Sequence, residues 1–450
     1  MNLKNKKILI IGLGITGISA VKTMEKFEAN ISVYDSKSEE DLKEFLDEIK
    51  NIDLNIYLNG EKPNLEDTDL ILKSPGVPRD IPILIEAQNK NIEIITDLEL
   101  YYRIKSGKNM VAISGTNGKT TTTKLTGEIF EKSGRNTYVA GNIGVGVLDS
   151  IFEIKDEDLM IIEASSFQLE NTIDFKPHIS AIVNITPDHI SWHGNFENYI
   201  DAKKKILSNQ DENDYAVLNY DDELLREIGE KIKTRVFWFS VGEKLENGSF
   251  IEDGWIVIRE EKKTIKIIKC DEIQIPGKHN LENVLASVSI SYLMGLSIED
   301  IARGLREFKG VEHRIEYVDM KNGISFYNDS KGTNPDSTIK AIEAIESPIV
   351  LIAGGYDKGS EYDELVTSFK GKVKELILLG ETSEKIKDAA LKIGFNRIHL
   401  VENMNQAVRI SFELADKNDN VLLSPACASW GMYSNFEERG KDFKNIVKGL

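Results

Sequence analysis

The stretch that decides the fold is Asn109–Lys124, "NMVAISGTNGKTTTTK". Its first half contains a short apolar run typical of a buried strand, and glycines then turn the chain sharply into a helix. The turn keeps Gly115, Gly118 and the Lys119-Thr120 pair of a phosphate-binding loop, although Ile113 stands where the full motif has its first glycine. Unpaired N–H groups at the start of a helix, with a lysine and a hydroxyl, suit a nucleotide phosphate and magnesium. The alternative is an ordinary turn between a strand and a helix.

Length and charge limit the class of protein. The chain has 450 residues, which favours about three domains at about 150 residues each. It contains 74 acidic and 56 basic residues, for a formal net charge of −18. Such a surface repels nucleic acids and anionic membranes, so we expect neither as a partner, and any phosphate site must be locally basic.

Cysteine usage and the N-terminus indicate the compartment. Cys270 and Cys427 have no metal-ligand or redox spacing, so we expect reduced thiols in a cytoplasmic protein. Residues Met1–Val21 have lysines before an apolar stretch, as a signal peptide does. Glycines interrupt this stretch, and a helix and a second strand follow it, so we interpret it as part of the mature domain. We find no other apolar run long enough to cross a bilayer.

The N-terminal segment carries a dinucleotide-binding fingerprint. In "KKILIIGLGITGIS" a strand runs into Gly12, Gly14 and Gly17, and Asp35 closes the next strand. Taken alone, this motif favours an NAD-binding domain. The phosphate loop follows too soon for both halves of a dinucleotide fold, however, so we expect a mononucleotide-sized group such as a nucleoside diphosphate. The rigid turn "LKSPGVPRD", Leu72–Asp80, follows a strand at the edge where open α/β sheets bind ligands.

Polar side chains end the later strands of the middle segment. The buried run in "DLMIIEASSFQLE" ends at Glu163, which is well placed to bind magnesium, although a capping or surface acid is the alternative. "AIVNITPDHISWHG" ends at Asp188 and His189. His189 and His193 are four residues apart, but we discount zinc because the glutamate of the metalloprotease helix is missing. Lysines such as Lys203 in "ENYIDAKKKIL" would by themselves indicate a solvated face.

Alternating strands and glycine-rich turns continue to the C-terminus, as in "FYNDSKGTNPDST" and "PIVLIAGGYDKG". This pattern predicts an α/β protein of three domains. We predict a Rossmann-like N-terminal domain at residues 1–96, a central P-loop-type ATPase domain with a mainly parallel sheet at 97–310, and a Rossmann-like C-terminal domain at 311–450.

A set of motifs along nearly the whole chain resembles the Mur ligases, the ATP-dependent enzymes that form peptide bonds in bacterial cell-wall synthesis. The motifs are "GTNGKTTTT", "EASSFQLE", "NITPDH", "YIDAK", "GKHNLEN", "EHR" and "DSKGTNP". "GLGITG", "SPG" and "LLSPACASWGMYSNFEERG" are most similar to members that join D-glutamate to UDP-N-acetylmuramoyl-L-alanine. The resemblance implies an acyl phosphate intermediate, with ATP, two magnesium ions and a carbamylated lysine as cofactors. It also implies a monomer that acts on small molecules.

The resemblance implies a role for individual residues. Lys119, His189 and Lys203 would be catalytic, with Lys203 carrying the carbamate. ATP contacts would be Gly115, Thr116, Asn117, Gly118, Lys119, Thr120, Thr121, Asn280, Asn283, Arg314 and Asp329, of which Arg314 would contact phosphate. Metal ligands would be Thr120, Glu163, His189 and Lys203. The UDP substrate would contact Gly14, Ile15, Thr16, Asp35, Ser36, Ser74 and Asn142, and D-glutamate would contact Thr333, Lys358, Ser429 and Phe436.

The sequence departs from the family pattern in two places. Lys37 stands where relatives often have arginine, so a bidentate or stacked contact at the uracil would be lost. After His189, Ile190, Ser191 and Trp192 replace the commoner Leu-Asp-Arg, which leaves open what supports the histidine.

Three other functions remain open at this stage. A sibling ligase, including a folylpolyglutamate synthetase, would share the ATP residues but should lack "SPACAS" and the N-terminal loop. An NAD-dependent oxidoreductase is supported only by Gly12 to Asp35. A nucleotide-sensing module has no need of the second metal that the acid, histidine and lysine set implies.

Overall fold

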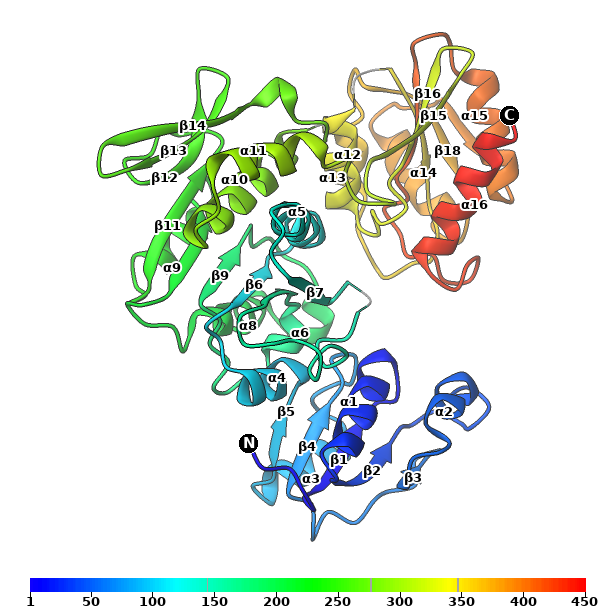
Figure 1. Cartoon of the computed structure of the whole chain (residues 1–450). Coiled ribbons are helices and arrows are strands. Elements are labelled where there is room, and N and C mark those ends of the chain that lie inside the picture. The colour runs from blue at the N-terminus through cyan, green and yellow to red at the C-terminus, as the bar shows by residue number, and fades with distance from the viewer. Residues whose placement is uncertain (144, 276, 346–347) are drawn as a thin grey trace. The chain divides into compact units, whose positions relative to one another are not determined.

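The structure is a computed structural model that describes residues 1–143, 145–275, 277–345 and 348–450. It contains sheets of five, nine and six strands, each covered by helices (Figure 1). The predicted α/β class is confirmed. The chain forms two compact units, Met1–Glu272 with Glu282–Arg306 and Ile273–Leu281 with Glu307–Leu450. The first two sheets belong to the first unit, and the predicted domain limits at residues 96 and 310 stay a prediction.

The first sheet, blue in Figure 1, is parallel and has the order β3-β2-β1-β4-β5. Its strands are β1 (Lys7–Ile11), β2 (Asn30–Tyr34), β3 (Leu54–Tyr57), β4 (Leu70–Lys73) and β5 (Glu93–Ile95). The helices between β1 and β6 along the chain are α1 (Ile15–Lys26), α2 (Lys43–Ile49), α3 (Pro82–Asn89) and α4 (Asp97–Lys105). The strand order reverses between β1 and β4, and such a switch point opens a ligand crevice at the carboxyl ends of the strands.

The second sheet has the order β14-β13-β12-β11-β10-β9-β6-β8-β7. Its strands are β6 (Met110–Ser114), β7 (Thr137–Gly141), β8 (Leu159–Glu163), β9 (Ile179–Ile182), β10 (Tyr215–Asn219), β11 (Arg235–Ser240), β12 (Gly248–Glu252), β13 (Trp255–Glu260) and β14 (Lys263–Lys269). The helices that follow β6 along the chain are α5 (Lys119–Lys132), α6 (Ser166–Leu169), α7 (Ile190–His193), α8 (Phe196–Lys204), α9 (Glu223–Gly229), α10 (Lys278–Leu293) and α11 (Ile298–Glu307). The sheet is parallel from β7 to β12, whereas β13 and β14 add an antiparallel edge. Every residue of β6, β8 and β9 is buried, as expected for parallel strands covered on both faces.

The third sheet, yellow to red in Figure 1, has the order β15-β16-β20-β17-β18-β19. Its strands are β15 (Glu316–Lys321), β16 (Ile324–Asn328), β17 (Ile349–Ala353), β18 (Val373–Leu378), β19 (Ile398–Leu400) and β20 (Asn420–Leu423). Its helices are α12 (Pro335–Ala344), α13 (Asp363–Thr367), α14 (Ser383–Lys392), α15 (Met404–Leu414) and α16 (Phe436–Lys448). β15 is antiparallel to β16, and the other neighbours are parallel.

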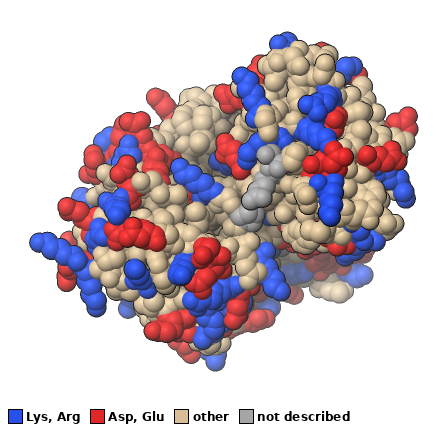
Figure 2. Space-filling view, turned by 90° about the horizontal axis from the view of Figure 1, so that it is seen from above, with Lys and Arg blue, Asp and Glu red and all other residues tan. Residues whose placement is uncertain are grey.

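The surface agrees with the mixed charge of the sequence. Lys and Arg are interspersed with Asp and Glu on the face shown in Figure 2. Cys270 and Cys427 are free, and burial raises the pKa of both thiols. Among the described residues, no helix is both long and apolar enough to cross a membrane.

Candidate functional site

The predicted phosphate loop lies between β6 and α5, as the sequence indicates. Gly115 and Gly118 have φ angles of +149° and +85°, a region that side chains with a Cβ rarely adopt. A Cβ on Gly118 would also overlap the side chain of Asn283, so both the backbone angle and the space available require glycine here. Thr122 Oγ1 lies 3.3 Å from Asn283 Oδ1. Asn283, a predicted ATP contact in α10, therefore packs against the start of α5.

A neighbouring strand end holds the loop from its side. The Asn117 amide donates to Asn184 Oδ1 at 2.8 Å, and Asn184 Nδ2 donates back to the Asn117 carbonyl at 3.1 Å. Thr116 Oγ1 lies 3.0 Å from both the Thr186 carbonyl and the Tyr199 hydroxyl, and it accepts the Thr186 amide at 2.9 Å. Asn184 and Thr186 belong to "NITPDH", but no local pattern in that stretch indicates this role.

Two lysines converge on one carbonyl of the loop. Lys119 Nζ donates to the carbonyls of Gly115 and Thr116, at 2.8 Å each. Lys203 Nζ, from α8, donates to the same Gly115 carbonyl at 2.6 Å. Burial, and then the positive charge of Lys119, hold the pKa of Lys203 well below its usual range, whereas Asp188 and Glu163 oppose this shift. The predicted solvated lysine is therefore a buried amine whose neutral form is favoured.

Glu163 ends β8 beside the loop strand and is buried. Its Oε1 accepts Asn142 Nδ2 at 2.9 Å. Its Oε2 is buried and has no hydrogen-bond partner in the described part of the chain. A buried carboxylate oxygen without a donor is costly, and a divalent cation would satisfy it. The donor set, with the Thr120 hydroxyl at the start of α5, therefore fits magnesium.

His189 is supported by an aromatic cluster. It has a φ of +52° at the N-terminus of α7, and its Nε2 lies 3.5 Å from Asp188 Oδ2. The Phe167 ring packs edge-on against His189 and also against Trp192, with centroids 4.8 Å apart in both pairs. Trp192 therefore supports His189 through Phe167. His193 is buried instead, with Nε2 3.1 Å from Ser166 Oγ, and burial lowers its pKa.

A cavity of about 600 Å³ lies at the switch point of the first sheet. All seven residues predicted to contact the UDP substrate line it, namely Gly14, Ile15, Thr16, Asp35, Ser36, Ser74 and Asn142. Lys37, the departure from the family pattern, lines it as well.

Hydrogen bonds within the glycine loop shape this cavity. Asp35 accepts the Leu13 amide at 2.7 Å and the Lys37 amide at 3.0 Å, so its carboxylate fixes the loop itself. Ser74 Oγ donates to the Gly12 carbonyl at 2.7 Å, and a Cβ on Gly12 would overlap the Ser74 side chain. The loop can therefore adopt this shape only with glycine at position 12.

Two further residues of this cavity were missed in the sequence. Gln168 Nε2 lies 3.2 Å from Asp97 Oδ2, and both side chains are buried in the wall. Burial raises the pKa of Asp97 to about 6, against hydrogen bonds from Gln168 and the Leu98 amide. Gln168 also caps α6 together with Ser165. Its place in "SSFQLE" was a signal for the family, but not for this cavity.

In the second unit, Arg314 and Asp329, which are both predicted to contact ATP, lie close together. Arg314 Nη1 is 3.6 Å from Asp329 Oδ1, and Ser424 Oγ donates to Asp329 Oδ2 at 2.7 Å. Burial raises the pKa of Asp329 to about 6, and Arg314 opposes this shift. Asn280, at the start of α10, is buried.

The residues predicted to bind D-glutamate follow three neighbouring strands. Thr333 follows β16, Lys358 follows β17 and Ser429 follows β20, and β20 pairs in parallel with both other strands. Their loops therefore share one edge of the sheet. Phe436 begins α16, and its carbonyl accepts Ser330 Oγ at 2.8 Å. Lys358 Nζ lies 6.0 Å from the ring centroid of Trp430, which is 52% exposed.

Arg439 ties these loops together and was missed in the sequence. Its buried guanidinium donates to Ser330 Oγ at 3.0 Å, to the Ser330 carbonyl at 2.8 Å and to the Cys427 carbonyl at 3.1 Å. Burial lowers the pKa of Arg439 to about 10. "FEERG" carries this arginine, but nothing local in that stretch indicates its partners.

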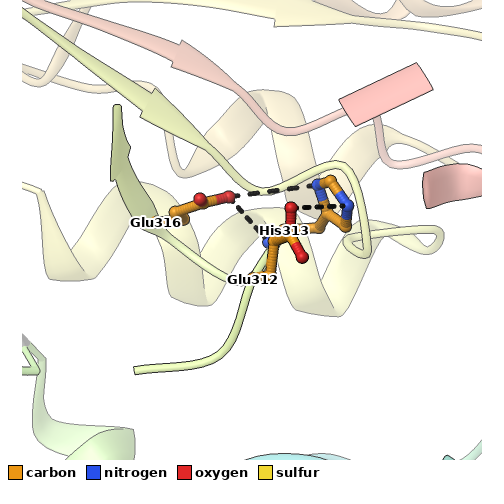
Figure 3. A group of neighbouring side chains, drawn as sticks. All are labelled: Glu312, His313 and Glu316. Carbon is orange, nitrogen blue, oxygen red and sulfur yellow. Dashed lines mark hydrogen bonds and ion pairs between the residues drawn. The ribbon is translucent and has the colours of Figure 1, made fainter. Parts of the chain in front are cut away.

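Glu312, His313 and Glu316 form a group that could in principle hold a metal ion (Figure 3). Lys444 Nζ already lies 2.5 Å from Glu312 Oε1 and 2.9 Å from Glu316 Oε1. Asn328 Nδ2 lies 2.8 Å from His313 Nδ1, so an amide donor makes this nitrogen the acceptor and leaves the ring proton on Nε2. The ammonium group of Lys444 therefore occupies the position that a metal ion would take, and these residues form an ion-pair network.

Three family models match the sequence: the Mur ligase MurD-like N-terminal domain at residues 6–96, the Mur ligase middle domain at 113–291 and the Mur ligase glutamate ligase domain at 313–427. The chain is 52% identical to UDP-N-acetylmuramoylalanine–D-glutamate ligase of Thermoanaerobacter sp. (strain X514) and 47% identical to that of Clostridioides difficile (strain 630), covering 100% of both chains in each comparison.

Two solved structures with a similar fold have much lower sequence identity to this chain. UDP-N-acetylmuramate-alanine ligase MurC from Thermotoga maritima has a TM-score of 0.62 at 19% identity, over 98% of this chain and 99% of that one. MurF ligase from Thermotoga maritima in complex with ADP has a TM-score of 0.61 at 18% identity, over 94% and 96%. At this identity the likeness concerns the fold alone.

Proposed function

This chain belongs to the Mur ligase family, and we propose that it joins D-glutamate to UDP-N-acetylmuramoyl-L-alanine with ATP, a step in the synthesis of peptidoglycan precursors. The observation that carries the proposal is the phosphate loop with Lys119 and Lys203 on one carbonyl, beside the buried oxygen of Glu163, which has no donor among the described residues.

The reaction needs an activated carboxylate. The terminal phosphoryl group of ATP passes to the carboxylate of the UDP substrate and leaves ADP and an acyl phosphate. The amine of D-glutamate attacks the acyl carbon and the amide bond forms. The bond between this carbon and the phosphate oxygen breaks, inorganic phosphate leaves, and the nitrogen releases a proton to solvent. Both steps depend on positioning and on offsetting negative charge, which the loop amides and Lys119 supply.

Magnesium, when bound, offsets charge on the phosphates. We assign Glu163 and Thr120 to one ion and His189 to a second. The buried Oε2 of Glu163 supports the first assignment. The packing of Phe167 against His189 supports the second, because it restricts the imidazole.

Lys203 acts as a carbamate in this proposal. A neutral amine attacks carbon dioxide, an N–C bond forms, and a proton is released to solvent. The lowered pKa of Lys203 favours the neutral amine that this step requires. The product is a hard oxygen ligand for magnesium, whereas an ammonium would repel the ion.

The two substrates take separate places in the proposal. The cavity at the switch point holds the UDP group, and Asn142 at its edge meets the muramoyl part. Thr333, Lys358, Ser429 and Phe436 hold D-glutamate, because a lysine with hydroxyl groups suits two carboxylates. Asn280, Asn283 and Asp329 contact the adenosine, and Arg314 contacts phosphate. We further propose a cytoplasmic monomer without nucleic-acid or membrane partners.

One assay separates this function from its alternatives. Phosphate release from ATP is measured with saturating UDP-N-acetylmuramoyl-L-alanine and a panel of D-glutamate, L-glutamate, D-alanine, L-alanine, L-lysine and a diamino acid. We expect steep preference for D-glutamate, since an analogue without its side-chain carboxylate leaves donors unpaired. Equal rates with the other amino acids would move the chain to a sibling ligase. Turnover that needs a nicotinamide cofactor would favour the oxidoreductase.

A further inference from the structure

The turn that carries Arg314 has a strained backbone. His313 and Ile315, on either side of Arg314, have φ angles of +64° and +47°. Such angles are unfavourable for residues other than glycine, and a β-branched residue tolerates them poorly. The turn is closed by the Arg314 amide, which donates to the Val311 carbonyl at 3.0 Å. A turn of this kind keeps its shape only if its surroundings hold it.

One face of α16 supplies that support. Phe436, Gly440 and Lys444 recur every four residues and therefore share a face of the helix. The Phe436 ring meets the His313 ring edge-on, with centroids 6.2 Å apart. A Cβ on Gly440 would overlap the His313 ring, so only glycine allows the helix to pack this closely.

Lys444 closes the network around the turn. Its ammonium bridges Glu312 and Glu316, and its hydrogen bond lowers the pKa of Glu312. Glu316 Oε2 accepts the His313 amide at 2.9 Å (Figure 3). It also accepts Asn328 Nδ2 at 3.0 Å. His313 is buried, and its ring Nδ1 lies 2.8 Å from Asn328 Nδ2. Neither its amide nor its ring can therefore exchange its contacts for water without opening the turn.

We propose that Gly440 and Lys444 are positioning residues that aim Arg314 at the nucleotide, by holding residues 311–316 in the strained turn. The proposal rests on the proposed function, in which Arg314 contacts an ATP phosphate. Phe436, at the start of the same helix, is a predicted D-glutamate contact. One rigid element therefore sets the positions of a nucleotide contact and of an amino-acid contact.

The test compares Lys444→Met with Lys441→Met, an exposed lysine of the same helix, as the matched control. The dissociation constant of a non-hydrolysable ATP analogue is measured by calorimetry, and KM is measured for each substrate. Lys444→Met should weaken the analogue and raise KM for ATP about tenfold, the equivalent of roughly 1.4 kcal/mol, without changing KM for the UDP substrate. Lys444→Arg should restore most of the affinity, and Gly440→Ala should weaken it as Lys444→Met does.

A double-mutant cycle shows whether Lys444 acts through Arg314. Arg314→Ala should weaken the analogue, and Lys444→Met should add little in that background. If Lys444→Met lowers the melting temperature but leaves the analogue's affinity at the level of Lys441→Met, the network is merely structural and the inference is wrong. Fully additive effects would also overturn it. These binding measurements need no acceptor, so they decide the inference even if no amino acid of the panel supports turnover.

Discussion

Replacing Asp97 with asparagine should stabilise the protein at neutral pH by removing a buried charge. Asp97 is the first residue of α4 and is only 6% exposed. Burial raises its pKa from 3.8 to about 6. One pKa unit corresponds to about 1.4 kcal/mol, so the charged carboxylate costs about 3 kcal/mol of unfolding free energy. The amide oxygen of the variant can still accept the Leu98 amide, which lies 3.0 Å from Asp97 Oδ1.

The sign of the pH dependence follows from the raised pKa. Below about pH 4 the carboxyl is protonated in both the folded and the unfolded chain, and its ionisation has no effect on stability. Between about pH 4 and pH 6 the unfolded chain loses the proton first, so the stability of the parent falls as pH rises. The asparagine variant has no such titration. The variant's advantage in unfolding free energy should therefore grow by about 3 kcal/mol from about pH 4 to pH 7.

Urea unfolding followed by tryptophan fluorescence measures this difference at each pH. Trp192, Trp238 and Trp255 lie in the same compact unit as Asp97, so they report its unfolding. Asp69→Asn is the control, because hydrogen bonds from Lys7 and Lys6 lower the pKa of Asp69 and its removal should have the opposite pH dependence. A difference between Asp97→Asn and the parent that stays constant from about pH 4 to pH 7 would refute the reasoning.

Three further predictions concern catalysis. Lys119→Ala should lower the rate about 10² to 10³-fold without loss of the circular dichroism spectrum, because a preorganised charged donor is removed, and a folded variant with most of its turnover would contradict the assignment. Lys203→Ala should be inactive and partly rescued by short carboxylates. A ¹³C-labelled carbamate signal should be present in the parent and absent from the variant, and full activity of the variant would contradict the metal role of Lys203. Trp430→Ala should raise KM for D-glutamate severalfold by freeing the Lys358 side chain, with Trp430→Phe closer to the parent, and an unchanged KM would exclude this contact.

Local sequence signals predicted the parts of the site that local geometry determines. The turn from β6 to α5 needs glycine at two positions with positive φ, and the glycines at 115 and 118 in the sequence therefore predict this turn. The cavity of the first sheet was predictable for a similar reason. The run from Gly12 marks the turn after β1, and Ser74 marks the turn after β4, and these are the two strands at the switch point.

Contacts between distant segments could not be predicted in this way. Asn184 pairs with Asn117 across 67 positions, and Arg439 reaches Ser330 across 109, so no local periodicity records either pair. The support of His189 shows the same limit. The sequence left open what supports His189, because the contact of Trp192 with Phe167 depends on how α6 and α7 pack.

The two lysines on the Gly115 carbonyl give a physical reason for the proposed carbamylation of Lys203. A carbonyl oxygen has two lone pairs and can accept both Nζ atoms, but two ammonium ions held by one atom repel each other. Burial, and then the charge of Lys119 beside it, lower the pKa of Lys203 well below its usual range, which favours its neutral form. The neutral amine that results is the form that reacts with carbon dioxide. The carbamate would replace the repulsion between two like charges by an attraction to Lys119. It would also replace an unfavourable buried amine by an oxygen ligand next to the phosphate loop.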